Sequence, residues 1–276
     1  MRALIALLLL LAPGPVAAQQ SRALISVDVE LFLAVDVSRS MSPRELEIQR
    51  RGYAEAISSK EVVRAIEDGA EGRIALTYVE WAGAGAQRVV VDWTIIDGAA
   101  AAADFAAKIS AHFDPALRRT SISSALDYAA ESIETNGFDG FRRVIDVSGD
   151  GPNNSGRPVA DARDDALARG IAINGLPLMT KEGLGAEWHL DDLDLYYEAC
   201  VIGGPTSFVR PVREWANFPA AVRDKIVQEL AAAPPVPGAA PGKIHKANFH
   251  LIPRARYDCL IGEKIWDRIR RNWGYP

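Results

Sequence analysis

The sequence is poor in the side chains that build soft-metal and redox sites. It has two cysteines, three methionines and four histidines among 276 residues. Positive charge is not in excess either, because 31 Lys and Arg stand against 36 Asp and Glu, for a net charge of −5. That balance argues against a nucleic-acid-binding surface. Beyond the N-terminal leader no apolar run is long enough to cross a bilayer, so we expect a mature chain without a transmembrane segment.

Three catalytic or cofactor motifs are also missing. The chain has no Gly-x-Ser-x-Gly nucleophile turn, no Gly-x-Gly-x-x-Gly after its first expected strand and no phosphate loop ending in Gly-Lys-Ser/Thr. Serine hydrolases, dinucleotide enzymes and phosphate-loop proteins are therefore disfavoured. The histidines lie away from the loops described below, at positions His112, His189, His245 and His250.

The first 18 residues have the organisation of a secretory signal peptide. Arg2 precedes a short apolar core, Pro13-Gly14-Pro15 breaks it, and Val16-Ala17-Ala18 supplies small residues for cleavage after about Ala18. The alternative, an uncleaved membrane anchor, would need a longer apolar core and a stop-transfer flank. We therefore expect a secreted or periplasmic protein.

Export gives meaning to the two cysteines, Cys200 and Cys259. A reactive thiol would need a basic neighbourhood, whereas both cysteines have acidic and apolar neighbours. A structural disulfide is the favoured interpretation, because an even number of cysteines in an oxidising compartment usually pairs.

Strand-like and helix-like segments alternate over most of the chain. This alternation predicts an α/β fold, a doubly wound and mostly parallel sheet with helices on both faces. Residues 73–81 and 87–95 are expected to form a hairpin, which makes the later strand an antiparallel edge strand. The other expected strands are 27–35, 143–148, 171–176 and a short one at 207–209; the expected helices are 43–69, 99–110, a segment ending near 137, 159–169, 191–200 and 214–231.

The composition divides the chain into parts. Residues 24–231 form the main domain, 232–242 are a linker of Pro, Ala and Gly, and 243–276 are a C-terminal extension with eight Lys or Arg against three acids. Ile261, Ile265 and Ile269 recur every fourth residue there, which indicates a basic amphipathic helix. Such a helix can contact a membrane surface or a partner; the favoured alternative is that it packs on the main domain, held by Cys259.

Oxygen-bearing side chains gather in three loops. Asp36, Ser38 and Ser40 follow the first strand, Thr120 precedes a later helix, and Asp150 ends a middle strand. Right-handed crossovers bring such loops to one edge of a parallel sheet, where open α/β sheets bind their ligands. The sequence therefore predicts a binding site at this edge.

The pattern Asp-x-Ser-x-Ser, then Thr, then Asp resembles the metal-ion-dependent adhesion site of von Willebrand factor type A (VWA) domains. The resemblance covers residues 27–230 and extends to a poorly characterised group of exported bacterial proteins. It implies that Asp36, Ser38, Ser40, Thr120 and Asp150 hold Mg²⁺, or Mn²⁺ or Ca²⁺, and that an Asp or Glu carboxylate from a partner protein completes the metal shell. The family usually has Thr where this chain has Gly149, beside the ligands rather than among them.

The chemistry of these residues agrees with the resemblance. Hydroxyls, carboxylates and water are hard oxygen ligands, which suit Mg²⁺, Mn²⁺ or Ca²⁺ better than Zn²⁺. Neutral hydroxyls leave residual positive charge on the ion, and that charge favours an anionic ligand. Asp36 and Asp150 are expected to act mostly through water or by orienting the hydroxyls.

Each residue taken singly has an ordinary explanation, such as a helix cap for Thr120 or an Asx-turn for Asp150. A metal-free structural exported domain is therefore one alternative. A metal-dependent hydrolase with an Asp36 nucleophile is a weaker alternative. It would need a second carboxylate two residues later, and that position is occupied by Ser38. We expect a non-enzymatic, cation-dependent protein-binding domain.

Overall fold

The computed structural model describes residues 23–111, 117–180, 190–231 and 257–272. The expected signal peptide, the linker 232–242 and residues 243–256 of the extension lie outside the described residues.

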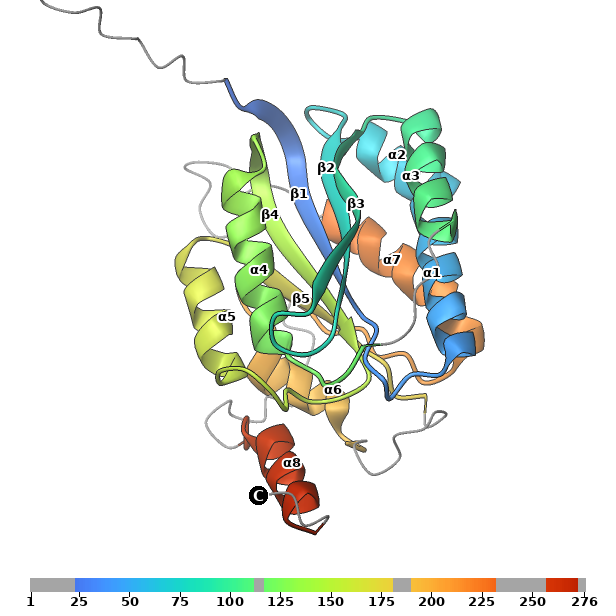
Figure 1. Cartoon of the computed structure of the whole chain (residues 1–276). Helices are drawn as coiled ribbons and strands as arrows, with labels where there is room; N and C mark the ends of the chain where they lie inside the picture. The colour runs from blue at the N-terminus through green and yellow to red at the C-terminus, as the bar shows by residue number, and fades with distance from the viewer. Residues whose placement is uncertain (1–22, 112–116, 181–189, 232–256, 273–276) are drawn as a thin grey trace, which may run out of the picture.

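The centre of the fold is a five-stranded sheet in the order β3-β2-β1-β4-β5 (Figure 1). β1 pairs in parallel with both β2 and β4, β5 is parallel to β4, and β3 is antiparallel to β2. The predicted doubly wound sheet with one antiparallel edge strand is confirmed. The strands are β1 (Ile25–Asp36), β2 (Ile74–Trp81), β3 (Gln87–Ile96), β4 (Phe138–Gly149) and β5 (Ala172–Pro177).

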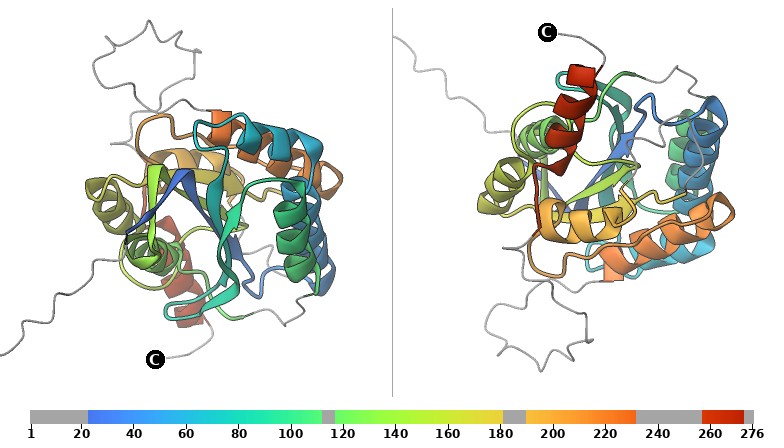
Figure 2. Two further views of the ribbon diagram at one scale, coloured as in Figure 1. Left: turned by 90° about the horizontal axis from the view of Figure 1, so that it is seen from above. Right: turned by 90° about the horizontal axis from the view of Figure 1, so that it is seen from below.

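Helices cover both faces of the sheet, so β1 is buried on both sides. Its alternate residues enter two separate cores: Leu31 and Leu33 pack with one group of helices, Phe32 and Ala34 with the other. One face carries α1 (Pro43–Ile57), α2 (Lys60–Glu67), α3 (Ala99–Ala111) and α7 (Phe218–Ala231); the other carries α4 (Ile122–Thr135), α5 (Val159–Ala168) and α6 (Leu193–Tyr196) (Figure 2).

Some element boundaries differ from the sequence expectations. The helix expected over 43–69 is two helices, because Ser59 accepts a hydrogen bond from the Val62 amide at 3.3 Å and starts α2 anew. β4 begins at Phe138 rather than 143, since β1 itself begins at Ile25 and pairs with it there.

The segments around β5 also differ. The expected helix 191–200 is only α6 followed by a π-helical turn, Tyr197–Val201, and the expected strand 207–209 is reduced to an isolated bridge between Val209 and Gly175. A 3₁₀ turn, Trp215–Asn217, precedes α7.

The described part of the C-terminal extension, residues 257–272, contacts the main domain. The predicted disulfide joins Cys200 to Cys259, with Cα atoms 5.5 Å apart. It places α8 (Ile261–Asn272) at the end of the molecule toward which β1 and β4 run (Figure 1).

Candidate functional site

The loop after β1 is held by α1 and by the N-cap of that helix. Asp36 ends β1, and its Oδ1 accepts a hydrogen bond from the Ser38 amide at 2.7 Å. Gln49, on α1, donates from Nε2 to the Asp36 carbonyl at 2.8 Å. The helix starts with a capping box, in which Ser42 and Glu45 bond each other's backbone amides. The loop between strand and helix is therefore fixed at both ends.

Two of the three oxygen-rich loops meet through side chains. Ser38 Oγ lies 2.9 Å from Ser40 Oγ, and Ser40 Oγ donates to Asp150 Oδ1 at 2.8 Å, although Ser40 and Asp150 are 110 residues apart. Asp36, Ser38, Ser40 and Asp150 thus form one continuous cluster of oxygen atoms at the carboxyl edge of the sheet.

Thr120 lies in the third loop, which runs alongside the other two. The Leu117 amide donates to the Val37 carbonyl at 2.9 Å. The Asn154 amide donates to the Thr120 carbonyl at 2.9 Å, and the Thr120 amide donates to Asn154 Oδ1 at 3.1 Å. The Thr120 side chain is nearly buried. Arg119 before it has a φ of 70°, a left-handed conformation that non-glycine residues adopt at a cost of about 1 kcal/mol or more.

The electrostatics of this cluster favour a bound cation. Asp36 is fully buried, and its Oδ2 has no hydrogen-bond partner. Burial, followed by the repulsion of Asp150, raises the pKa of Asp36 well above the ordinary carboxyl range. Within the described ranges no ion pair reaches Asp36.

The set of donors is oxygen only and mostly neutral. No group of three or more His, Cys, Asp or Glu that could hold a metal occurs in the described part of the chain, so a site here depends on hydroxyls and two carboxylates. Such a set fits a small hard cation that keeps several waters. A proton on Asp36 is the other way to relieve its buried charge.

A second layer of residues lies behind the cluster, and the sequence interpretation missed it. A Cβ on Gly149 would lie 2.8 Å from Tyr197 Oη, 2.9 Å from Asp36 Oδ2 and 3.3 Å from Trp81 Cζ2. Tyr197 and Trp81 are fully buried, and neither Tyr197 Oη nor Trp81 Nε1 has a hydrogen-bond partner. Gly149 is therefore required by close packing, and no local motif around Tyr197 marks it as a neighbour of the site.

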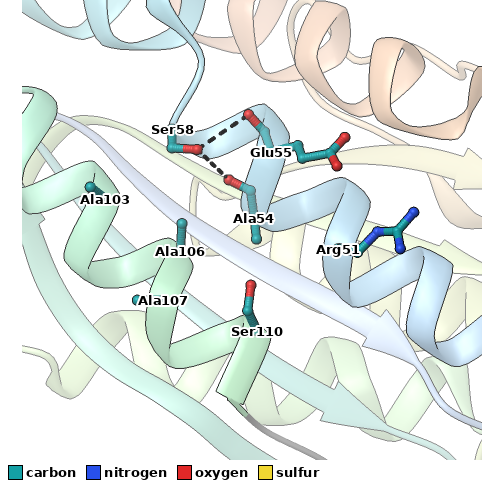
Figure 3. A pocket seen from close by; sticks show the side chains of 8 residues that line it. All are labelled: Arg51, Ala54, Glu55, Ser58, Ala103, Ala106, Ala107 and Ser110. Carbon is teal, nitrogen blue, oxygen red and sulfur yellow. Dashed lines mark hydrogen bonds between the residues drawn. The ribbon is translucent and has the colours of Figure 1, made fainter.

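The pocket drawn in Figure 3 lies elsewhere, between α1 and α3. It is a groove of about 340 Å³ in which alanines of α3 face α1, and Ser58 donates to the Ala54 carbonyl at 2.8 Å. The oxygen cluster at the sheet edge lines no part of it. Its lining residues are Arg51, Ala54, Glu55, Ser58, Ala103, Ala106, Ala107 and Ser110.

None of the helices in the described segments has both the length and the apolar character needed to traverse a lipid bilayer.

Comparison with solved structures identifies the fold. Proximal thread matrix protein 1 from the mussel byssus matches with 13% identity and a TM-score of 0.55, over 75% of this chain and 49% of that one. A von Willebrand factor type A protein from Catenulispora acidiphila has 17% identity, a TM-score of 0.50, and coverage of 74% and 43%. The pilus adhesin SpaC from Lactobacillus rhamnosus GG has 11% identity, a TM-score of 0.52, and coverage of 74% and 30%.

The described chain thus has the VWA-like α/β fold expected from the sequence, and it spans half or less of the length of these three proteins. No curated protein matches its sequence. A family described as "Protein of unknown function (DUF1194)" matches residues 26–234. Since that match covers most of the 276 residues, the chain belongs to the DUF1194 family, with a VWA-like fold.

Proposed function

We propose that this protein is an exported domain that binds another protein through a divalent cation. Asp36, Ser38, Ser40, Thr120 and Asp150 hold the cation, and an Asp or Glu carboxylate of the partner is the ligand that completes its shell. When bound, the cation supplies a fixed positive charge of high density at this edge of the sheet.

One observation carries this proposal: a fully buried carboxylate oxygen, Asp36 Oδ2, without a hydrogen bond, in a cluster that continues through Ser38 and Ser40 to Asp150. A buried charge is stable only when it is paired, bound to a metal or protonated. The hydroxyls of Ser38 and Ser40 are already brought to the same place by the loop, so little reorganisation is needed to bind an ion.

The oxygen donors favour Mg²⁺, with Mn²⁺ or Ca²⁺ as the alternatives. A structure of the mussel byssus protein, 15% identical over 75% of this chain, is described with zinc in its MIDAS motif. That neighbour supports a divalent ion at this place in the fold, and the donor chemistry decides which ion we test first.

Export and the absence of catalysis belong to the same proposal. The leader before Ala18 and the disulfide between Cys200 and Cys259 both suit an oxidising compartment outside the cytoplasm. Asp36 is followed two residues later by Ser38, whose hydroxyl contacts Ser40, so the position that a phosphoryl-transfer enzyme fills with an acid/base carboxylate holds a neutral group.

Calorimetric titration of the mature protein with Mg²⁺ and Mn²⁺ tests the proposal. We expect one site per chain, lost in Asp36→Ala and in Thr120→Ala. Asp104→Ala, which removes an exposed carboxylate on α3, is the matched control and should bind as the wild type does. Circular dichroism of each variant confirms that it is folded.

The partner is then sought by pull-down from the cell envelope, with and without a chelator. A protein captured only in the presence of the metal, and not by folded Asp36→Ala, is the expected result. Equal isotherms for wild type and both site variants would reject the site, and metal-dependent turnover of generic phosphate or acyl esters would reject the non-enzymatic function.

A further inference from the structure

Exposed arginines are close neighbours in the sequence of the candidate site residues, although the whole chain has a net charge of −5. Arg39 stands between Ser38 and Ser40, and Arg119 directly precedes Thr120. Arg118 lies on the same loop as Arg119, and Arg44 lies in the first turn of α1, just after the loop that carries Arg39. All four are exposed, and no ion pair to any of them occurs within the described residues. We call these four residues the arginine rim.

Helix α8 forms a second wall beside these loops. Asn153, three residues after Asp150, donates from Nδ2 to Glu263 Oε1 at 2.7 Å. The contact between Gly262 and this loop is so close that a Cβ on Gly262 would lie 2.0 Å from the Asn153 carbonyl oxygen. On the loop that carries Thr120, Arg119 stacks on Trp266 of α8, with its guanidinium carbon 4.4 Å from the ring centroid. α8 therefore docks on both loops that carry Thr120 and Asp150.

The docked helix adds more positive charge to this edge of the molecule. Its four cationic residues outnumber its two acids, and all four are exposed: Lys264, Arg268, Arg270 and Arg271 against Glu263 and Asp267. Seen from below, α8 lies across the carboxyl edge of the sheet, beside the start of α4 (Figure 2, right). The arginine rim and α8 together gather eight cationic side chains at this edge of an acidic protein, and two of them form ion pairs, Lys264 with Asp258 and Arg270 with Asp267.

The rim arginines weaken binding of the cation alone, although the buried Asp36 favours it. The candidate cluster offers two carboxylates, Asp36 and Asp150, while each rim arginine repels a divalent ion. A ligand with several carboxylates reverses the balance, because one can reach the cation while the others meet the arginines. A single carboxylate leaves the rim unpaired.

We propose that the arginine rim and α8 bind an acidic peptide segment of the partner, and that this segment and the cation bind cooperatively. The inference rests on the proposed function, since it names the class of partner for the same site. Cooperativity follows because segment and ion each reduce the repulsion that the other meets, and by linkage the two effects on affinity are equal.

An anionic membrane is the competing partner, and α8 is poorly placed for it. Trp266 is covered by Arg119, and the isoleucines Ile265 and Ile269 are already partly buried. A helix that lies in a bilayer surface needs its apolar face free. Here that face is directed at least in part to the protein's own loops.

The test compares Arg39→Gln/Arg119→Gln and Arg268→Gln with Arg64→Gln, an exposed arginine on α2 at the opposite end of the molecule (Figure 1). Two affinities are measured at low salt. One is for Mn²⁺ alone, by calorimetry; the other is for a fluorescent peptide of alternating Glu and Gly in saturating Mn²⁺, by anisotropy, with Gln replacing Glu in the control peptide.

The two affinities should change in opposite directions. We expect the double rim variant to bind Mn²⁺ alone about two- to five-fold more tightly, because repulsion is removed, and the Glu peptide at least about five-fold more weakly. Arg268→Gln should weaken the peptide without weakening Mn²⁺, and Arg64→Gln should change neither. Loss of packing cannot produce this result, because it would weaken both affinities.

Other results overturn the inference. Unchanged peptide affinity in the rim variants, or weakening of both affinities, means that the arginines do not recognise the partner. Arginine-dependent binding to mixed phosphatidylcholine and phosphatidylglycerol vesicles, without peptide binding, assigns the rim to a membrane instead. Failure of the proposed function is distinct: the wild type then does not bind Mn²⁺ at all, or binds it equally after Asp36→Ala.

Discussion

Among the places where this domain buries carboxylates, two differ in the cation that faces them. Between β4 and α7, Lys225 Nζ lies 2.6 Å from Asp146 Oδ1 and 2.5 Å from Glu229 Oε1, and all three side chains are fully buried. At the carboxyl edge, Asp36 is equally buried beside Asp150, but none of the described basic side chains forms an ion pair with it. We call these places the inner cluster and the edge cluster.

The comparison distinguishes carboxylates that are neutralised by a lysine of the chain from a carboxylate that is free to bind a ligand. Buried carboxylates must be compensated, by a partner in the chain, by a proton or by a bound cation. The inner cluster includes its own cation and is closed by Asn174, which donates to Glu229 Oε1 at 2.9 Å. In the edge cluster, by contrast, Asp36 forms no ion pair within the part of the chain that the structure describes.

Removing the cation from the inner cluster gives the largest effect we expect. Lys225→Met leaves Asp146 and Glu229 buried and uncompensated, and should lower the free energy of unfolding by about 3–5 kcal/mol at pH 8. Urea denaturation followed by circular dichroism measures it. Lys108→Met, at an exposed position on α3, is the matched control and should change stability by less than about 0.5 kcal/mol.

The loss caused by Lys225→Met should shrink as the pH falls. Burial, opposed by Lys225, raises the pKa of Asp146 to about 7 in the wild type, so the folded protein binds a proton more tightly than the unfolded chain does. This contribution makes stability fall as pH rises from about 4 to 7. Without Lys225 the pKa of Asp146 should rise further, so protonation at low pH should offset more of the lost stability. An equal loss of unfolding free energy at pH 5 and pH 8 would contradict this role of the inner cluster.

The packing behind the edge cluster gives an intermediate effect. Gly149→Ala places a methyl group 2.8 Å from Tyr197 Oη and 2.9 Å from Asp36 Oδ2, and should destabilise the protein by about 1–3 kcal/mol. Tyr197→Phe removes the phenol oxygen, so the double variant should recover part of that loss. Thermal unfolding of the four proteins gives the coupling; additive losses would show that Tyr197 does not set the space at Gly149.

The doubly wound, mostly parallel sheet with its antiparallel edge strand was predictable, because it depends on periodic patterns and on the handedness of crossovers; the strand order β3-β2-β1-β4-β5 was not predicted. Asp36, Ser38 and Ser40 follow a strand as a local motif, and Ser42 with Glu45 marks the start of the next helix. Local motifs of this kind can be recognised in the sequence without knowledge of the tertiary contacts. The contact of Ser40 with Asp150 follows from the same topology.

Other features depend on contacts between residues distant in the chain. Tyr197 belongs to a π-helical turn, and nothing in its local sequence places its hydroxyl beside Gly149. From the sequence alone Lys225 would be assigned to the solvent-facing side of α7, whereas in the structure it is buried and pairs with Asp146 of β4. The stacking of Arg119 on Trp266 joins segments more than a hundred residues apart, and it holds α8, together with the disulfide and the Asn153 contact.

The smallest effect we expect is also the one that distinguishes the two clusters most directly. Burial and the nearby Asp150 raise the pKa of Asp36, so its charge destabilises the metal-free fold, increasingly as pH rises above the ordinary carboxyl range. Asp36→Asn should therefore stabilise the metal-free protein by about 1 kcal/mol at pH 8, or about 2–4 °C in Tm, and remove that pH dependence.

Saturating Mg²⁺ should raise the Tm of the wild type and of Asp104→Asn but not of Asp36→Asn. The inner cluster predicts the opposite sign for its own lysine, since Lys225→Met destabilises with or without Mg²⁺. If Asp36→Asn lowers the Tm of the metal-free protein, or if Mg²⁺ raises its Tm as much as that of the wild type, the edge carboxylate is as structural as the inner one and the distinction between the clusters fails.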